Sequence, residues 1–264
     1  MPKLAVIGFP VAHSRSPAMQ SAALAELGLG GAWSYEAVEA EPAEFEATVR
    51  RLAAARFAGA NVTVPHKEAA LALADELSEA AREIGAANTL VFEGGRIAAD
   101  NTDAGGLLAA LPGTPRGLRA LVLGAGGAAR AVLWALGREG ARVDVWNRTP
   151  ARAQTICAEL GGTPVADPDQ GDYALIVNTS AAGLHGEDPL EQLPLVAERF
   201  GPDQTVLDMV YGEQSSPLLE AARAGGATVV DGLEILVQQG ALSLRIWTGL
   251  EPPIDAMRAA VRRR

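Results

Sequence analysis

Short apolar runs alternate along the chain with longer stretches that are rich in alanine and leucine. The runs contain aliphatic and β-branched residues, as buried strands do, and they cover residues 4–7, 61–64, 121–123, 143–146, 175–177, 206–209 and 228–230. Most of the stretches between them have helical length, and they include residues 17–27, 44–54, 67–84, 129–138 and 150–160. Because strands that alternate with helices form parallel sheets covered on both faces, the pattern predicts an α/β fold.

A glycine-rich loop follows the apolar run at residues 118–123. The loop reads Gly124-Ala125-Gly126-Gly127-Ala128-Ala129, which is G-x-G-x-x-A, and an alanine-rich helix is predicted directly after it. In this context of strand, loop and helix, glycines let the backbone approach a pyrophosphate at the N-terminus of the helix. A tight turn that binds nothing is the alternative for the motif alone, and the context favours a dinucleotide-binding domain.

The strand predicted at residues 143–146 ends about 20 residues after the glycine loop, where the adenosine ribose of a dinucleotide is expected. Proteins specific for NAD usually carry Asp or Glu there, whereas this chain reads Asn147-Arg148-Thr149-Pro150-Ala151-Arg152. Two guanidinium groups four residues apart suit a 2′-phosphate, so the sequence predicts NADP(H) as the cofactor. The alternative for Arg148 and Arg152 is a solvated helix start, with Thr149 as N-cap and Pro150 as the first helical residue.

The composition of the chain argues against several kinds of binding partner. The formal net charge is −10, and no basic cluster appears apart from residues 262–264, which argues against nucleic acid and anionic membranes as partners. No apolar run approaches the roughly 20 residues that span a bilayer, and the N-terminal segment lacks the features of a signal peptide. The single cysteine, Cys157, excludes an internal disulfide. We therefore expect a cytoplasmic protein whose partner is a small molecule.

Lysine is much rarer than arginine in this chain. Lys3 and Lys67 are the only lysines among 22 basic residues, and Lys67 lies in the stretch NVTVPHKEA. An arginine cannot exchange a proton near neutral pH because its pKa exceeds about 12, whereas burial and neighbouring charges can bring the pKa of a lysine into range. The rarity of lysine therefore modestly favours a chemical role for Lys67. A solvated lysine in the first turn of a helix is the alternative.

Several segments carry, in order, a resemblance to a known family. They are Gly8-Phe9-Pro10, His13-Ser14-Arg15-Ser16-Pro17, Asn61-Val62-Thr63-Val64-Pro65-His66-Lys67, Gly85-Ala86-Ala87-Asn88-Thr89-Leu90, Asp100-Asn101-Thr102-Asp103, Gly124-Ala125-Gly126-Gly127-Ala128, Asn147-Arg148-Thr149, Asp208-Met209-Val210-Tyr211 and Asp231-Gly232-Leu233. Taken together, they resemble the shikimate dehydrogenase family nearly from end to end. The resemblance implies an NADP-dependent oxidoreductase of aromatic amino acid biosynthesis, which reversibly reduces 3-dehydroshikimate to shikimate with NADPH.

The resemblance also implies two α/β domains with a cleft between them. Residues 1–102, completed by a C-terminal helix at residues 238–264, would form the substrate-binding domain. Residues 103–237 would form the NADP-binding domain, a Rossmann-type doubly wound parallel sheet. The dinucleotide signal near residue 118 agrees with this division.

The same resemblance assigns the site residues one by one. Lys67 would be the general acid/base with Asp103 as its partner, although Asp103 could instead be the N-cap of a helix at residues 104–111. Ser14 and Ser16 would bind the substrate carboxylate, and a helix N-cap is the alternative for Ser16. The ring hydroxyls would contact Asn61, Thr63, Asn88, Tyr211 and Gln239, together with Lys67 and Asp103. The cofactor would contact Gly124, Ala125, Gly126, Gly127, Ala128, Asn147, Arg148, Thr149, Arg152, Met209 and Gly232.

The three histidines, His13, His66 and His185, show no metal-ligand spacing, so we expect no metal site. His66 is next to Lys67, but adjacent side chains on a helix diverge, so it ranks behind Lys67 as a candidate base.

Other readings of the whole chain stay open. It could be a paralogue that oxidises quinate or uses another cofactor, or an NADP-binding protein that lacks catalysis. An amino-acid or methylene-folate dehydrogenase with a similar cofactor domain would not account for Ser14 and Ser16. A homodimer is also left open.

Overall fold

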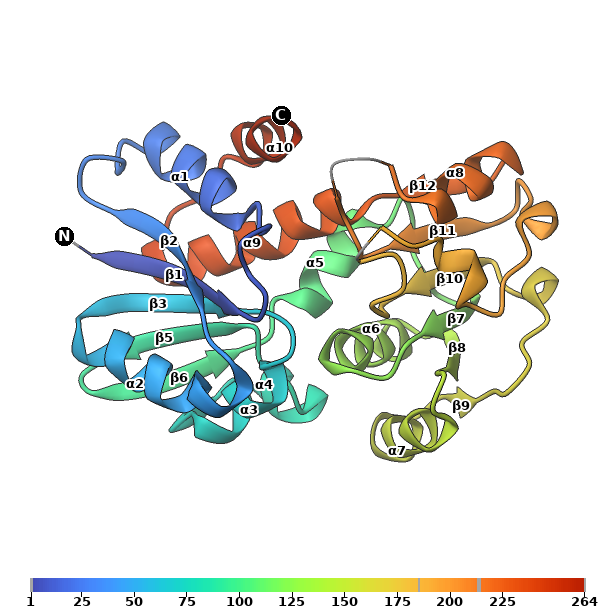
Figure 1. Ribbon diagram of the computed structural model, residues 1–264, viewed down its shortest axis with the longest axis horizontal. Helices are drawn as coiled ribbons and strands as arrows, with labels where there is room; N and C mark the ends of the chain where they lie inside the picture. Colours follow the sequence, from blue (N-terminus) through green and yellow to red (C-terminus); the bar gives the residue numbers. More distant parts are fainter. Residues whose placement is uncertain (1, 185, 213–214, 264) are drawn as a thin grey trace. The chain divides into compact units, whose positions relative to one another are not determined.

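The structure, a computed structural model, describes residues 2–184, 186–212 and 215–263 (Figure 1). The chain divides into two compact units, the first made of Met1–Gly106 and Leu236–Arg264 and the second made of Leu107–Ile235. Among the described residues, each unit is built on a six-stranded sheet. The α/β fold predicted from the alternation of strands and helices is therefore confirmed.

The sheet of the first unit is mixed. Its strands are β1 (Lys3–Gly8), β2 (Ser34–Glu39), β3 (Phe57–Val62), β4 (Glu76–Leu77), β5 (Thr89–Glu93) and β6 (Arg96–Asp100), in the order β2-β1-β3-β5-β6-β4. The predicted parallel arrangement is wrong at β5, which runs antiparallel to β3 and to β6. Gly94 and Gly95 form a two-residue turn that reverses the chain between β5 and β6. Both glycines have positive φ, which suits the tight turns of hairpins.

Helices of the first unit pack around this sheet. They are α1 (Ser16–Glu26), α2 (Phe45–Ala54), α3 (Lys67–Leu73), α4 (Glu79–Ile84), α5 (Asp103–Ala110), α9 (Gly232–Thr248) and α10 (Ile254–Arg262), with a 3₁₀ turn η1 (Pro42–Glu44) before α2. Helices α5 and α9 continue across the division into the second unit. The core beneath α2 is aliphatic and aromatic, and it includes Ile7, Phe45, Val49, Val62 and Leu90.

The single helix predicted at residues 67–84 is wrong, since the structure breaks it into α3 and α4 with the short strand β4 between them. The backbone of Ala74 turns extended, and the amide of Asp75 then donates to the carbonyl of Ile97 beside β6. Ser78 restarts the helix as a true N-cap, because its side chain accepts from the amide of Ala81. Pairing with β6 thus overrides a helix-like composition.

The second unit has the strand order of a Rossmann fold. Its elements are β7 (Arg119–Leu123), α6 (Gly127–Arg138), β8 (Arg142–Trp146), α7 (Pro150–Leu160), β9 (Thr163–Pro164), η2 (Gln170–Asp172), β10 (Leu175–Asn178), η3 (Pro189–Glu191), η4 (Ala197–Arg199), β11 (Thr205–Asp208), α8 (Pro217–Ala224) and β12 (Thr228–Val230). The strand pairs are all parallel, in the order β12-β11-β10-β7-β8-β9. The order reverses between β7 and β10, which is where such sheets bind ligands. The predicted Rossmann-type sheet is confirmed.

The helices of the second unit pack on different strands of its sheet. Helices α6 and α7 contact β7, β8 and β9, while α8 contacts β11 and β12 (Figure 1). The core contains Leu121, Leu123, Ile176 and Val206 from the strands and Leu218 from α8. Within the described residues of both units, no helix is long and apolar enough to cross a membrane.

Candidate active site

Lys67 and Asp103 form a nearly buried ion pair in the first unit. Lys67 is the first residue of α3 and Asp103 is the first residue of α5. The Lys67 Nζ donates to Asp103 Oδ2 at 2.6 Å, and the two side chains are 12% and 6% exposed. A solvated lysine and an N-capping aspartate do not describe these contacts. The arrangement instead places a primary ammonium and a carboxylate together, largely shielded from water.

Asn88 fixes the other oxygen of the Asp103 carboxylate. The backbone N–H of Thr102 donates to Asn88 Oδ1 at 2.7 Å, and this sets the orientation of the amide because a backbone N–H can only donate. Asn88 Nδ2 then donates to Asp103 Oδ1 at 2.9 Å and lies 3.2 Å from Gln239 Oε1. Each carboxylate oxygen of Asp103 is therefore held by a different side chain.

Helix α9 brings Gln239 to this group, although Gln239 lies 151 residues after Asn88. The helix packs closely on α5, since a Cβ added to Gly106 would lie 2.7 Å from the backbone nitrogen of Gln239. On the side of α1, Gln20 Nε2 donates to the carbonyl of Gly240 at 2.9 Å. The position of Gln239 is thus set by close backbone packing of the helix that carries it.

A buried cluster of three hydroxyls lies next to Asn88. The hydroxyl oxygens of Thr89, Thr102 and Ser243 are 2.8–3.3 Å apart. The Asn61 amide joins the cluster, because its Nδ2 donates to Ser243 Oγ at 2.9 Å and its Oδ1 accepts from the hydroxyl of Tyr35 at 2.8 Å. Asn61 is therefore engaged by protein groups on both sides of its amide.

The residues of this cluster are not among those predicted from the sequence. Thr89 and Thr102 lie in the segments that carry the family resemblance, directly beside Asn88 and Asp103. Ser243 lies four residues after Gln239 and so shares its face of α9. The helical spacing was a usable signal for Ser243, whereas no local signal pointed to Tyr35.

The two serines predicted to bind a carboxylate lie at the start of α1. Ser14 Oγ accepts from the backbone N–H of Ser16 at 3.3 Å, and Ser16 is buried. The N-cap interpretation of Ser16 is wrong: Ser16 is the first helical residue, and Arg15 occupies the N-cap position without a side-chain cap. Ser14 supplies the oxygen for the first amide instead. Thr63 is half-buried in the loop after β3, and its amide donates to the carbonyl of Ile7.

His66 belongs to the core rather than to the Lys67 pair. Its Nε2 lies 2.8 Å from the carbonyl oxygen of Ala40, so this nitrogen carries the proton, and its ring stacks on Phe45 with centroids 4.4 Å apart. Burial lowers the pKa of His66, although the bond to Ala40 acts in the opposite direction. The side chain therefore favours its neutral form and has a structural role.

In the second unit, the glycine loop follows β7 at the reversal of strand order. Gly124 has a φ of +117°, and a Cβ there would lie 2.6 Å from the hydroxyl oxygen of Thr179, which follows β10. Gly126 occupies the N-cap position of α6 and has open space around its Cα, while Gly127 and Ala128 begin the helix. Backbone amides at this helix start have no side-chain cap, which leaves them suited to an anion.

Two free cations lie at the next turn, between β8 and α7. Asn147 Nδ2 donates to the carbonyl of Thr149 at 2.9 Å, and Thr149 occupies the N-cap position before Pro150 without capping through its side chain. Arg148 and Arg152 are exposed, and neither guanidinium has an ion pair or hydrogen bond within the part of the chain that the structure describes. Both guanidinium groups are therefore available to an anion.

Asp208 organises the loop after β11, which carries Met209 and Tyr211. Its carboxylate is buried and accepts from Asn178 Nδ2 at 2.9 Å, from Ser216 Oγ at 2.5 Å and from the backbone of the loop. Burial raises the pKa of Asp208, against the opposing effect of these hydrogen bonds. Gly232, at the start of α9, packs against the backbone of Met209. Tyr211 is half-buried and belongs to the second unit, unlike the other predicted substrate residues.

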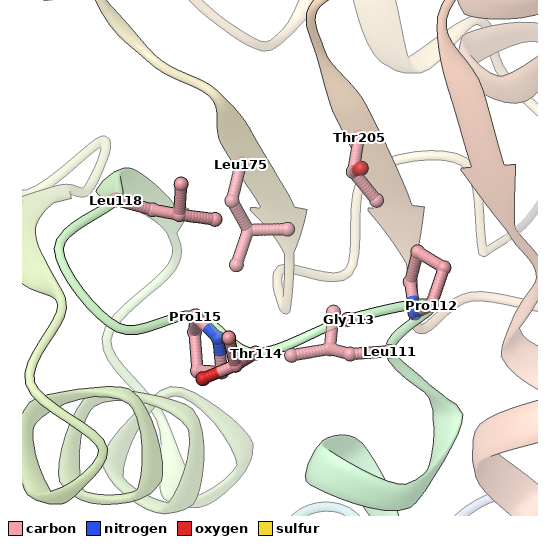
Figure 2. Close-up of a pocket in the computed structure, with 8 residues that line it drawn as sticks. All are labelled: Leu111, Pro112, Gly113, Thr114, Pro115, Leu118, Leu175 and Thr205. Atoms are coloured by element: carbon pink, nitrogen blue, oxygen red, sulfur yellow. The ribbon is translucent and has the colours of Figure 1, made fainter.

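A small apolar cavity elsewhere in the second unit is unrelated to these residues. It has a volume of about 190 Å³, and Figure 2 shows Leu111, Pro115, Leu118, Leu175 and Thr205 around it. Leu175 and Thr205 begin β10 and β11, whereas the glycine loop follows the opposite end of the sheet. Among the described residues, no group of three His, Cys, Asp or Glu side chains is placed to hold a metal ion, and His185 lies outside those residues.

Comparison with known proteins decides the family. Residues 6–90 match the model for the shikimate dehydrogenase substrate binding domain, and residues 232–262 match the model for the shikimate 5′-dehydrogenase C-terminal domain. The shikimate dehydrogenase (NADP(+)) of Thermus thermophilus is 46% identical over 269 residues, which cover 100% of this chain and 98% of that protein. The chain belongs to the shikimate dehydrogenase family. The resemblance predicted from the motifs is therefore confirmed.

Other members of the family agree in length and fold. The shikimate dehydrogenase (NADP(+)) of Acidiphilium cryptum is 44% identical over 95% of this chain and 91% of its own length. A crystal structure of shikimate 5-dehydrogenase from Thermus thermophilus, in complex with NADP(H) and shikimate, superposes with a TM-score of 0.89 at 43% identity over 99% of each chain. The match to the family's substrate binding domain contains Ser14, Asn61, Thr63, Lys67 and Asn88.

Proposed function

We propose that this protein is a shikimate dehydrogenase, which reversibly reduces 3-dehydroshikimate to shikimate with NADPH. The observation that carries the proposal is the nearly buried pair of Lys67 and Asp103, found in a member of this family. In this proposal the first unit binds the substrate and the second binds NADP(H). The unit boundaries lie at Gly106 and Leu236, so Asp103 belongs with Lys67.

Lys67 is the proposed general acid/base. In the reducing direction its ammonium gives a proton to the carbonyl oxygen of 3-dehydroshikimate, and in the oxidising direction the amine takes the proton from the hydroxyl. Asp103 holds the ammonium through Oδ2, while Asn88 holds Oδ1 and keeps the carboxylate from rotating. Proton transfer by a positioned group contributes about 10²- to 10⁴-fold to the rate.

The substrate is a ring that carries one carboxylate and several hydroxyls. We assign the carboxylate to Ser14 and Ser16, because a helix N-terminus whose N-cap residue makes no side-chain cap, next to two hydroxyls, is suited to an anion. We assign the ring hydroxyls to Thr63, Asn88, Gln239, Tyr211 and Asn61. Asn61 contributes indirectly, because its amide already forms hydrogen bonds with Tyr35 and Ser243.

The residues of the second unit fit NADP(H). Gly124 has no room for a side chain, and the amides that follow can bind the pyrophosphate. Arg148 and Arg152 are unpaired within the described part of the chain and suit the 2′-phosphate, with Asn147 and Thr149 shaping the turn. We place Met209 and Gly232 beside the nicotinamide and Ala125, Gly127 and Ala128 beside the phosphates. The bound cofactor supplies the hydride.

The test is an initial-rate assay of the purified protein. With shikimate and NADP⁺, the absorbance of NADPH should rise, and replacement of shikimate by quinate or of NADP⁺ by NAD⁺ should lower kcat/KM. Faster oxidation of quinate would show the paralogue, and NADP⁺ binding without turnover would show a protein that lacks catalysis. Sedimentation of the same sample decides between a monomer and a homodimer, and cell fractionation tests the expected cytoplasmic location.

A further inference from the structure

Arg15 lies between the two serines assigned to the carboxylate, yet its side chain is bonded to the far end of the chain. Its Nη1 donates to the carbonyl oxygen of Val261 at 2.8 Å and lies 3.3 Å from that of Arg263, 246 and 248 residues further on. These carbonyls are at the C-terminal end of α10. An arginine beside an anion site would ordinarily be expected to bind the anion itself.

The end of a helix is a favourable place for such a cation. The last carbonyls of a helix have no partner within it, and the helix dipole places partial negative charge there. The C-cap of α10, Arg263, is extended, so the chain leaves the helix without a glycine cap. Arg15, which occupies the N-cap position of α1, donates to these carbonyls of α10.

Helices α1 and α10 also contact each other and lie side by side in Figure 1. Met257 and Val261 of α10 are fully buried, so this helix is fixed to the first unit by packing as well as by the arginine. The Ser14 amide donates to the carbonyl of Val11, and the Ser14 hydroxyl accepts from the Ser16 amide. The serine segment is thus held locally by short-range bonds and anchored by Arg15.

We propose that Arg15 is a positioning residue for substrate binding. It holds the backbone of Ser14 and Ser16 in place by anchoring it to the C-terminal end of α10, and it does not contact the substrate. The affinity for the substrate then depends on the last turn of α10, although no residue of α10 is assigned to substrate binding. The inference rests on the proposed function, because it needs these serines to bind the carboxylate.

Two variants disturb the two ends of this connection separately. Arg15→Ala removes the donors, and Ala259→Pro breaks the last turn of α10 at an exposed position while it leaves Arg15 intact. Ala259→Ser is the matched control at the same position, and Arg15→Lys retains a cation that can donate to the carbonyls. Circular dichroism and thermal unfolding of every variant establish that it is folded.

Both Arg15→Ala and Ala259→Pro should raise KM for shikimate by about 10- to 100-fold, because small misplacements of binding groups have effects of this size. KM for NADP⁺ and kcat should change by less than about twofold, since the loss concerns substrate binding alone. The double variant should be no worse than the more affected single one, Arg15→Lys should recover most of the affinity, and Ala259→Ser should match the parent.

A rise in KM for Arg15→Ala that Ala259→Pro does not reproduce would mean that Arg15 touches the substrate, and the proposal would be wrong. Unchanged KM in both would refute it equally. If the parent protein itself does not turn over shikimate, the proposed function fails first and this inference falls with it, so the two failures are told apart by the parent assay.

Discussion

Two substitutions of Lys67 distinguish the effect of its charge on the protein from the effect of proton transfer, because each removes a different property. Lys67→Arg keeps a cation opposite Asp103 but removes the amine, and an arginine stays protonated and cannot transfer its proton. Lys67→Met keeps most of the side-chain length and removes both. In the parent, the 2.6 Å contact and side-chain exposures of 12% and 6% leave little access for water to act instead.

The expected magnitudes differ between the two variants. Loss of general acid/base catalysis should lower kcat by about 10²- to 10⁴-fold, which is about 3–5 kcal/mol of transition-state stabilisation. Lys67→Arg should show this loss with a nearly unchanged melting temperature. Lys67→Met should also lose about 1.5–3 kcal/mol of folding free energy, the usual worth of a hydrogen bond to a charged group, because Asp103 keeps only its bond from Asn88.

The assay is the initial rate of shikimate oxidation at saturating NADP⁺, together with shikimate binding by calorimetry and thermal unfolding. Binding should stay within a few-fold of the parent in Lys67→Arg, so that the loss appears in kcat. If Lys67→Arg turns over at the rate of the parent, a fixed positive charge is sufficient, and the proton-transfer role of Lys67 must be abandoned.

Arg148→Ala should raise KM for NADPH by about 10- to 100-fold, the equivalent of one or two lost charge-assisted hydrogen bonds, and should leave KM for NADH nearly unchanged. Gly106→Ala should destabilise the protein by about 1–3 kcal/mol, because the new Cβ would lie 2.7 Å from the backbone nitrogen of Gln239. His66→Gln should flatten the loss of stability on acidification. Burial lowers the pKa of His66 from its usual 6.5, so its contribution is complete above that pH and is lost as the pH falls through the folded-state pKa.

Each of these outcomes has its own control. Equal effects of Arg148→Ala on NADPH and NADH would refute recognition of the 2′-phosphate. Gly137→Ala, inside α6 with open space around it, should instead gain up to about 1 kcal/mol in chemical denaturation, and a similar loss in both glycine variants would contradict the packing argument. As the pH is lowered from 6.5, the free energy of unfolding should fall less steeply in the His66 variant than in the parent, and an identical slope would assign the acid sensitivity elsewhere.

The Rossmann fold of the second unit could be predicted from sequence because its signals are local. The glycine loop, the apolar strand before it and the helix after it lie within a few residues of each other, and the strand order follows from repeated right-handed crossovers. The first unit was harder. Its edge strand β2 is mostly exposed and has no long apolar run. The Gly94-Gly95 turn of the β5–β6 hairpin was a usable signal, but it does not fit a pattern of strands that alternate with helices.

The candidate site also contains some residues that could be predicted from the sequence and others that could not. Lys67 could be singled out by composition, and most other assignments depended on motifs of a known family. The cluster of Thr89, Thr102 and Ser243 could not be predicted, since strand β5, the link between β6 and α5 and the distant helix α9 must pack before those hydroxyls meet. Arg15 could not be given a role from sequence either, because its bond to α10 joins residues that lie 246 positions apart.

The first unit is assembled from two separate stretches of chain, and this has a consequence for protein synthesis. The second unit is continuous, so it can fold outside the ribosome while the stretch that carries Gln239 and Ser243 is still inside the exit tunnel. A nascent chain would then contain a folded second unit and an incomplete first unit. Competence for turnover should arrive late and abruptly during translation, and messages cut short before codon 239 should yield products that bind the cofactor yet convert nothing.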